Sequence, residues 1–268
     1  MFGLQRWQVE NTVKLIDEGN TIPFIARYRK EAHGTLDDQV LRELSEKLEY
    51  LRNLDKRREE ISASITAQEK MTPEIEAALE KASTLAEIED IYRPFRPKRR
   101  TRASIAKEKG LEPLADAIFA QVADSASPTE LAADYIDAEK GVETVEDAIN
   151  GAMDIIAENI SDDADIRRRL RSLFTVAGVL QSRAADSEKE SVYTMYYEYD
   201  EPVNKIAGHR VLAVNRGENE GFLKVGIDVD RIKALNIINA NVLSDNGSAC
   251  TDTVRDAAAD AYDRLIFP

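Results

Sequence analysis

Hydrophobic residues in the first 175 positions recur at helical spacing. The longest such pattern predicts an amphipathic helix of about 30 residues, with apolar positions mostly three or four apart on one face. Those positions are Leu41, Leu44, Leu48, Leu51, Leu54, Ile61 and Ile65. The opposite face is charged and needs no partner beyond water. We expect this helix to begin at a capping box formed by Thr35 and Asp38, and to act as a spine for shorter helices.

Shorter helices are predicted on both sides of this spine. The first carries Trp7 and Ile16 and ends at Gly19, and the second begins at Pro23 and runs to Gly34. The two form a helix–turn–helix-like pair, a pattern that is most often a packing unit. Capping residues or prolines mark later helix starts at Thr72, Thr84, Pro113 and Ser127.

The pattern changes after about residue 190. Four tyrosines fall within positions 193–199, where packing is a more frequent role than base stacking. Alternation from Phe222 to Val229 predicts a short strand, and a last helix is expected from Thr251 to Leu265. The fold is therefore predicted to be mainly α: a multi-helix array with a small α/β element near 205–230. We expect a helical domain over 1–190 and a smaller mixed segment over 191–268.

Charge is unevenly distributed along the chain. The net charge is −14, yet residues 1–110 carry 21 Lys and Arg against 20 Asp and Glu, while residues 111–268 carry 15 against 30. The acidic C-terminal part should repel phosphates, so any anion-binding surface is expected in the N-terminal part. No apolar run approaches the roughly 18 residues of a membrane span. A cytoplasmic protein with no membrane contact is expected.

The sequence offers little support for catalysis. The two histidines, His33 and His209, are far apart and lie in no metal-ligand spacing, and no glycine-rich phosphate loop is present. Asp162, Asp163 and Asp165 more plausibly favour a helix N-terminus than hold a metal ion. The single cysteine, Cys250, excludes an intrachain disulfide and has no nearby cationic motif to activate it. We expect no enzyme activity, no metal and no cofactor.

One stretch, IYRPFRPKRRTRA at 91–103, concentrates positive charge. From Arg93 to Arg102 it has six cations and no acid. We call residues 93–102 the basic segment. Its prolines favour an extended chain, arginines suit bidentate phosphate contact, and Tyr92 or Phe95 could stack on a base. A helix beginning near Ala103 would add its N-terminus. The candidate nucleic-acid-binding residues are Arg96, Lys98, Arg99, Arg100 and Arg102.

Three hypotheses for the basic segment stay open at this point. It could bind phosphate, pair with acidic helices of its own chain, or dock an acidic partner protein. A secondary basic spot lies beside Tyr28 and consists of Arg27, Arg29 and Lys30. Its role could equally be structural.

Several stretches together carry a family resemblance. These are VENTVKLIDEGNTIPFIARYRKEAHG, LRELSEKLEYLRNLDKRREEI, DIYRPFRPKRRTRASIAKEKGLEPLA and HRVLAVNRGENEGFLKV. In this order they resemble the N-terminal region of the Tex family of bacterial transcription accessory proteins. The resemblance implies large cytoplasmic nucleic-acid-binding proteins, related to a eukaryotic transcription elongation factor. Their chains continue into a ribonuclease H-like domain, helix–hairpin–helix motifs and an OB-fold RNA-binding domain, towards which residues 191–268 would lead.

The resemblance implies two alternative functions. In the first, the chain is the N-terminal scaffold and auxiliary nucleic-acid-facing region of a Tex-like protein. Its partner would be single-stranded RNA or DNA, bound through the full-length protein. In the second, it is a protein-interaction scaffold that docks on the transcription machinery, and nucleic acid is bound only by C-terminal domains. The family's affinity is attributed mainly to the OB-fold domain, which favours the second; the basic segment favours the first.

Overall fold

The computed structural model describes residues 3–97, 100–124 and 126–268. They form two compact units, one ending at Tyr92 and the other beginning at Arg93. The described residues are mainly helical, with one small antiparallel sheet, as the sequence predicts. In the sequence, the boundary between the units falls at the start of the basic segment. The domain boundary expected near residue 190 stays a prediction.

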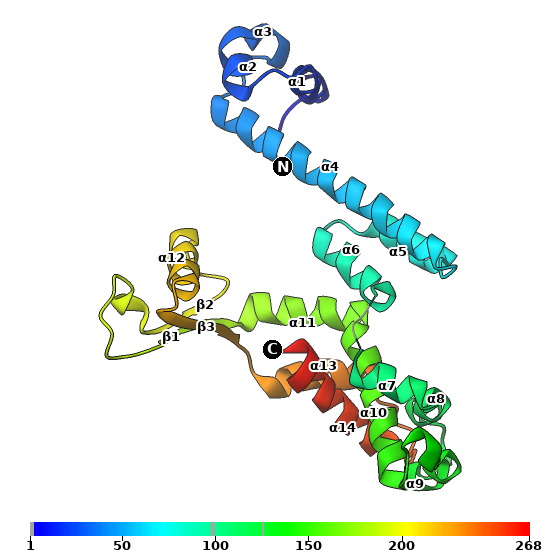
Figure 1. Ribbon diagram of the computed structural model, residues 1–268. Helices are drawn as coiled ribbons and strands as arrows, with labels where there is room; N and C mark the ends of the chain where they lie inside the picture. Colours follow the sequence, from blue (N-terminus) through cyan, green and yellow to red (C-terminus); the bar gives the residue numbers. More distant parts are fainter. Residues whose placement is uncertain (1–2, 98–99, 125) are drawn as a thin grey trace. The chain divides into compact units, whose positions relative to one another are not determined.

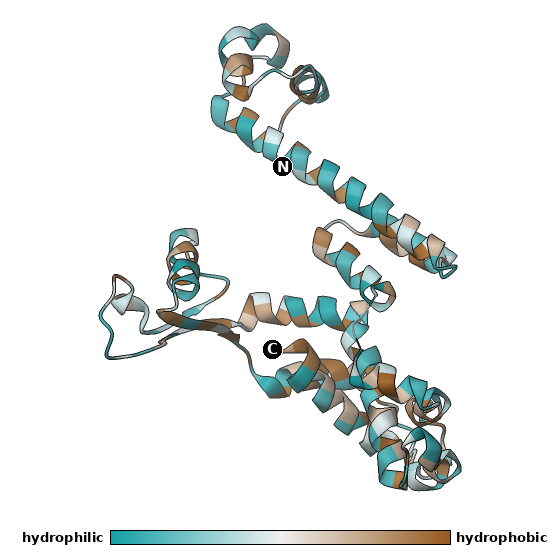
Figure 2. Ribbon diagram, in the orientation of Figure 1, coloured by the Kyte–Doolittle hydropathy of each residue, from teal (hydrophilic) through white to brown (hydrophobic). Residues whose placement is uncertain are grey.

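The first unit is built around its longest helix. Its elements are α1 (Arg6–Asp17), α2 (Ile22–Tyr28), α3 (Lys30–His33), α4 (Asp38–Ala67), α5 (Pro73–Lys81) and α6 (Leu85–Tyr92). The predicted spine is confirmed as α4, which has 30 residues. The helices α1 to α3 lie near its start and α5 and α6 near its end (Figure 1). Most of α4 is hydrophilic (Figure 2), because only a narrow stripe faces its neighbours.

Two details of this unit differ from the sequence prediction. The second predicted helix is divided into α2 and α3, because Arg29 leaves the helical region at φ −126°. The capping box of Thr35 and Asp38 is wrong. Thr35 follows Gly34 into the left-handed region, at φ 59° and 67° respectively, so it belongs to the turn that ends α3. The cap of α4 is instead Asp37, whose carboxylate accepts the Gln39 N–H at 3.1 Å.

The second unit surrounds α10. Its helices are η1 (Arg93–Phe95), α7 (Arg102–Glu108), α8 (Glu112–Ala120), α9 (Pro128–Ala132), η2 (Ala133–Tyr135), η3 (Ala138–Lys140), α10 (Val145–Asp162), α11 (Ala164–Ala177), η4 (Thr194–Tyr196), α12 (Gly208–Asn219), α13 (Arg231–Val242), α14 (Thr251–Asp260) and the π-helical η5 (Ala261–Ile266). The helices α7, α8, α9 and α14 pack on α10 (Figure 1). Their shared core includes Ile155 and Ile156, both fully buried.

A small sheet follows α11. It consists of β1 (Val179–Ala184) between β2 (Glu198–Pro202) and β3 (Leu223–Asp228), both antiparallel to β1. The register pairs Val179 with Pro202 on one side and with Asp228 on the other. The sequence predicts only β3, so the mixed element is larger than expected. Tyr193 and Tyr196 are buried in a hydrophobic cluster with Leu223, which confirms packing for these two tyrosines.

Candidate nucleic-acid interface

The basic segment is anchored where it begins. Arg93 lies in η1, which packs on α10, and its Nε donates to Asp162 Oδ1 at 3.0 Å. The Asp162 side chain is only 10% exposed. A carboxylate this far removed from water favours a nearby cation strongly. Arg93 therefore holds the start of the segment against the second unit. The sequence predicts a role for Asp162 at a helix N-terminus, whereas the cap of α11 is Asp163, which accepts the Ile166 N–H.

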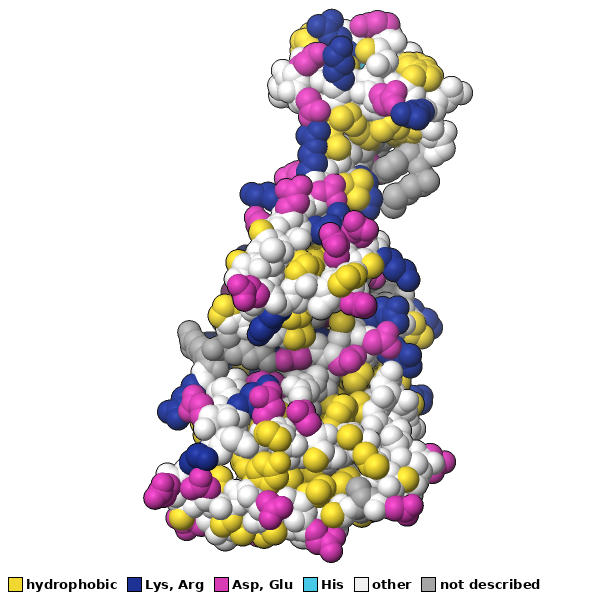
Figure 3. Space-filling view, turned by 90° about the vertical axis from the view of Figure 1, so that its right-hand side faces the viewer, with side chains coloured by type: hydrophobic (Ala, Val, Ile, Leu, Met, Phe, Trp, Pro, Cys, Tyr) yellow, Lys and Arg dark blue, Asp and Glu magenta, His cyan; other side chains and the backbone are white. Residues whose placement is uncertain are grey.

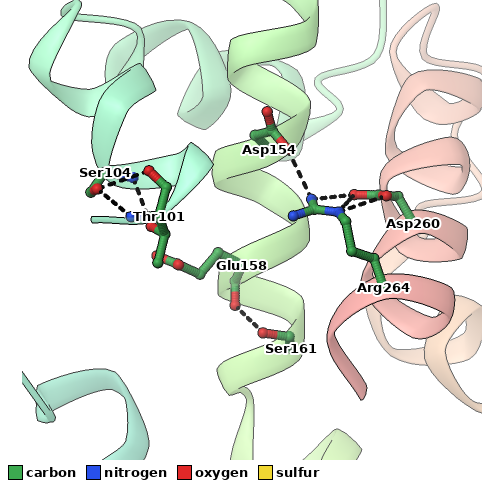
Figure 4. A network of polar contacts seen from close by, with 7 residues as sticks. All are labelled: Thr101, Ser104, Asp154, Glu158, Ser161, Asp260 and Arg264. Carbon is green, nitrogen blue, oxygen red and sulfur yellow. Dashed lines mark hydrogen bonds and ion pairs between the residues drawn. The ribbon is translucent and has the colours of Figure 1, made fainter. Parts of the chain in front are cut away.

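The other end of the segment is occupied by the start of α7. Thr101 and Ser104 form a reciprocal capping box, with the Thr101 hydroxyl accepting the Ser104 N–H at 3.0 Å (Figure 4). The cap of α7, which has 7 residues, is thus formed by its own side chains. Whether this helix N-terminus contributes to anion binding stays a prediction. Arg102, its first residue, is exposed and lines a hollow of about 220 Å³ with Asp154 and Asn150.

An acidic row on α10 faces this segment. Asp154, Glu158 and Asp162 follow one another at intervals of one helical turn. Burial raises the pKa of Asp154, and the charges of Arg264 and Arg102 oppose that rise. Arg264 donates to Asp154 at 2.8 Å and also pairs with Asp260 of α14 (Figure 4). The spacing of four residues could have revealed the row in the sequence. Asp162 of this row pairs with Arg93 at the start of the basic segment, and the charge of Arg102 at its end lies close enough to act on Asp154.

Arg96 and Arg100 of the segment are exposed to solvent. Arg96 is exposed, and its backbone N–H donates to the Arg93 carbonyl at 3.3 Å. Arg100 pairs with Glu108 at 3.2 Å, but the two side chains are 71% and 62% exposed. Such a pair contributes about 0–1 kcal/mol and is easily exchanged for another anion. Lys98 and Arg99 lie outside the described residues.

Replacing Arg93 with glutamine should reduce the free energy of unfolding of the second unit by about 1–2 kcal/mol, between the values for exposed and buried pairs. The cause is the loss of the Asp162 partner. Urea unfolding followed by circular dichroism measures the change. The matched variant Arg100→Gln removes an exposed pair and should change the free energy by less than about 0.5 kcal/mol. Equal stability of both variants would contradict the anchoring role.

The secondary basic spot lies on the first unit. Arg27 is in α2, Arg29 at the corner between α2 and α3, and Lys30 at the start of α3; all three are exposed. The Arg29 guanidinium lies 5.5 Å from the centre of the Phe24 ring. The position of Tyr28 beside these cations is evident from the sequence, whereas the contact with Phe24 is not. Whether α1 and α2 act as a DNA-binding helix–turn–helix stays a prediction.

Two expected absences concern membranes and metals. None of the described helices combines the length and the apolar character needed to cross a bilayer. Within the described ranges, no three or more His, Cys, Asp or Glu side chains are grouped so as to hold a metal ion. The cytoplasmic location and the lack of cofactor and of enzyme activity stay predictions.

Comparison with known protein families gives two matches. The model described as the Tex-like protein N-terminal domain matches residues 1–66, and the one described as Tex central region-like matches residues 123–262. The second covers α10, α11, the sheet and most of the C-terminal helices. The basic segment lies between the two matched ranges.

Curated relatives agree with these matches. Uncharacterized protein YdcI of Bacillus subtilis is 42% identical over 99% of this chain and 37% of its own length. Transcriptional accessory protein Tex of Neisseria gonorrhoeae is 39% identical over 82% of this chain and 29% of its own. The human S1 RNA-binding domain-containing protein 1 is 30% identical over 84% of this chain and 23% of its own length. The chain thus spans well under half the length of these relatives.

Proposed function

This chain belongs to the Tex-like protein family, and on that premise we propose that it is the N-terminal scaffold and auxiliary nucleic-acid-facing region of a transcription accessory protein. Single-stranded RNA or DNA is its partner, bound together with other parts of the longer protein. The name of the human relative, which specifies an S1 RNA-binding domain, supports this class of partner. The contacting residues are Arg96, Lys98, Arg99, Arg100 and Arg102.

One observation carries the proposal: Arg93 is paired with a mostly buried carboxylate, whereas the pair that Arg100 forms with Glu108 is exposed. A phosphate can replace Glu108 at Arg100 with little loss, because the existing pair is weak. The Arg93–Asp162 pair fixes the start of the segment on the second unit. Arginine then provides two parallel hydrogen bonds to phosphate oxygens.

The chain itself is proposed to be non-catalytic and to act in the cytoplasm. The support is indirect: its two histidines are separated in the sequence, and the fully buried His33 is bonded to backbone groups. A histidine held in this way is not positioned to transfer protons to a substrate.

Charge reversal tests the proposal. Fluorescence anisotropy of labelled single-stranded RNA and duplex DNA, at two salt concentrations, compares the chain with Arg99→Glu/Arg100→Glu. We expect the parental affinity to fall with salt and the variant to bind at least about tenfold more weakly, because contacts to phosphate release counterions. The control Arg231→Glu/Arg255→Glu changes the net charge equally, at residues of the C-terminal helices. Equal binding by the parental chain and the segment variant would contradict the proposal.

A docking scaffold for the transcription machinery is the second candidate. The supporting observation is exposed hydrophobic surface in the second unit, where Phe119, Val122 and Ile136 are 40%, 58% and 46% exposed. Hydrophobic side chains also gather on one face of this unit in Figure 3, with acidic side chains around them. Exposed apolar surface bounded by charge is typical of protein contacts. Absence of nucleic-acid binding by the parental chain would favour this candidate.

A further inference from the structure

An aromatic pair is exposed on α2. Phe24 and Tyr28 are one turn apart on the helix, and their ring centres are 5.3 Å from each other. The two residues are 37% and 59% exposed. Ile25, on the other side of the same short helix, is fully buried against the first unit's core. The helix is therefore fixed through Ile25, while the two rings remain accessible to solvent.

A cation is held against this pair by the corner between α2 and α3. The Ile25 carbonyl accepts the Arg29 N–H at 3.0 Å and also lies 3.2 Å from His33 Nε2. These bonds define the corner from which the Arg29 guanidinium reaches over the Phe24 ring. Arg27 and Lys30 are exposed beside it in the chain. Three cations and two rings are thus contributed by seven consecutive residues.

The cations of this spot differ from others in the first unit. Arg6, Arg42 and Arg52 each pair with a carboxylate, at 2.6 to 2.7 Å. In contrast, among the residues that the structure describes, Arg27, Arg29 and Lys30 form no ion pair. Lys and Arg side chains reach the surface beside hydrophobic ones over the α1–α3 end of this unit (Figure 3). Their charge is available to an anion from outside.

We propose that Phe24, Arg27, Tyr28, Arg29 and Lys30 form a binding site for single-stranded nucleic acid, separate from the basic segment. Unpaired bases stack on the rings, and the backbone phosphates pair with the cations. A duplex fits less well, because its bases are already stacked on one another and do not present their faces. An acidic peptide would use the cations but not the faces of the rings. The choice of single-stranded nucleic acid as the ligand of this site rests on the proposed function.

Removing the rings tests the site directly. The probes are fluorescein-labelled 12-nucleotide oligouridine, oligothymidine and a 12-base-pair duplex, titrated into the full 268-residue chain. Phe24→Leu/Tyr28→Leu keeps apolar bulk but loses the aromatic faces. We expect about a tenfold rise in Kd for both single strands, and little change for the duplex. The separate variant Phe24→Tyr/Tyr28→Phe keeps an aromatic ring at each position and should bind with the parental affinity. Single-strand binding that is unchanged in the leucine variant overturns the proposal.

Charge variants separate the cations of this site from general electrostatics. Arg27→Gln/Lys30→Gln should weaken single-strand binding. It should also reduce the slope of log affinity against log salt concentration by the equivalent of about two phosphate contacts. The matched control Arg6→Gln/Arg42→Gln removes the same charge from cations that already have carboxylate partners. Equal effects of the two pairs would overturn the site. The proposal would also be overturned if polyglutamate competed for the cations while the leucine variant bound RNA normally. Circular dichroism melting checks that each variant is folded.

Comparison with Arg99→Glu/Arg100→Glu distinguishes failure of this inference from failure of the proposed function. Loss of binding only in the ring variant would support this site and contradict the role of the basic segment. Loss of binding only in Arg99→Glu/Arg100→Glu would support the role of the basic segment and contradict this site. Loss in both supports both surfaces. Absence of single-strand binding by the parental chain would overturn both.

Discussion

Replacing Ile156 with alanine should lower the free energy of unfolding of the second unit by about 2–5 kcal/mol. The residue is fully buried in the middle of α10, the helix on which α7, α8, α9 and α14 pack. Truncation removes three carbon atoms from the core and leaves a cavity that four neighbouring helices cannot close together. Urea unfolding followed by circular dichroism measures the loss.

Two controls accompany the Ile156→Ala measurement. Val176→Ala truncates a side chain that is 66% exposed and should change stability by less than about 0.5 kcal/mol. Amide hydrogen exchange should show faster opening of α10 but unchanged protection in α4, because the core around Leu41 belongs to the other compact unit. A loss below about 1 kcal/mol would mean that α10 is not the centre of its core.

Helices with local start signals could be predicted from the sequence. Ser127 begins α9 because its hydroxyl accepts the Glu130 N–H, and the Glu130 carboxylate accepts the Ser127 N–H. These groups are three residues apart, so the pattern is visible in the sequence. The strands β1 and β2 carry no such local signal. β1 pairs Val179 with Pro202 of β2 and with Asp228 of β3, so the sheet depends on contacts between distant parts of the chain.

The candidate sites, too, could be predicted only where their signals are local in the sequence. The cations of the basic segment are visible in the sequence, but their partners are not. Asp162, which binds Arg93, is distant in sequence and near only because η1 packs on α10. The proximity of Arg29 to Phe24 likewise depends on the break between α2 and α3. A composition count treats all these cations alike, whereas the structure separates anchored ones from exposed ones.

Replacing His33 with leucine should destabilise the α1–α3 part of the first unit by about 2–3 kcal/mol. His33 is fully buried. Its Nδ1 accepts the Leu36 N–H at 3.0 Å, so the neutral ring carries its proton on Nε2, which donates to the Ile25 carbonyl. Leucine has similar bulk but leaves the partly buried Leu36 N–H without its acceptor, and a donor that is removed from water and unsatisfied costs more than a lost bond. Hydrogen exchange of α1 and α2 measures the effect locally.

The other histidine gives a matched control for this substitution. His209 is exposed at the start of α12, so His209→Leu should change stability by less than about 0.5 kcal/mol. Because the His33 bonds also define the corner that carries Arg29, His33→Leu should weaken single-strand binding in parallel with the loss of protection in α2. If His33→Leu lost stability but kept full affinity, the corner would not be what positions Arg29. If it lost neither, the two hydrogen bonds of the ring would contribute nothing measurable to the fold.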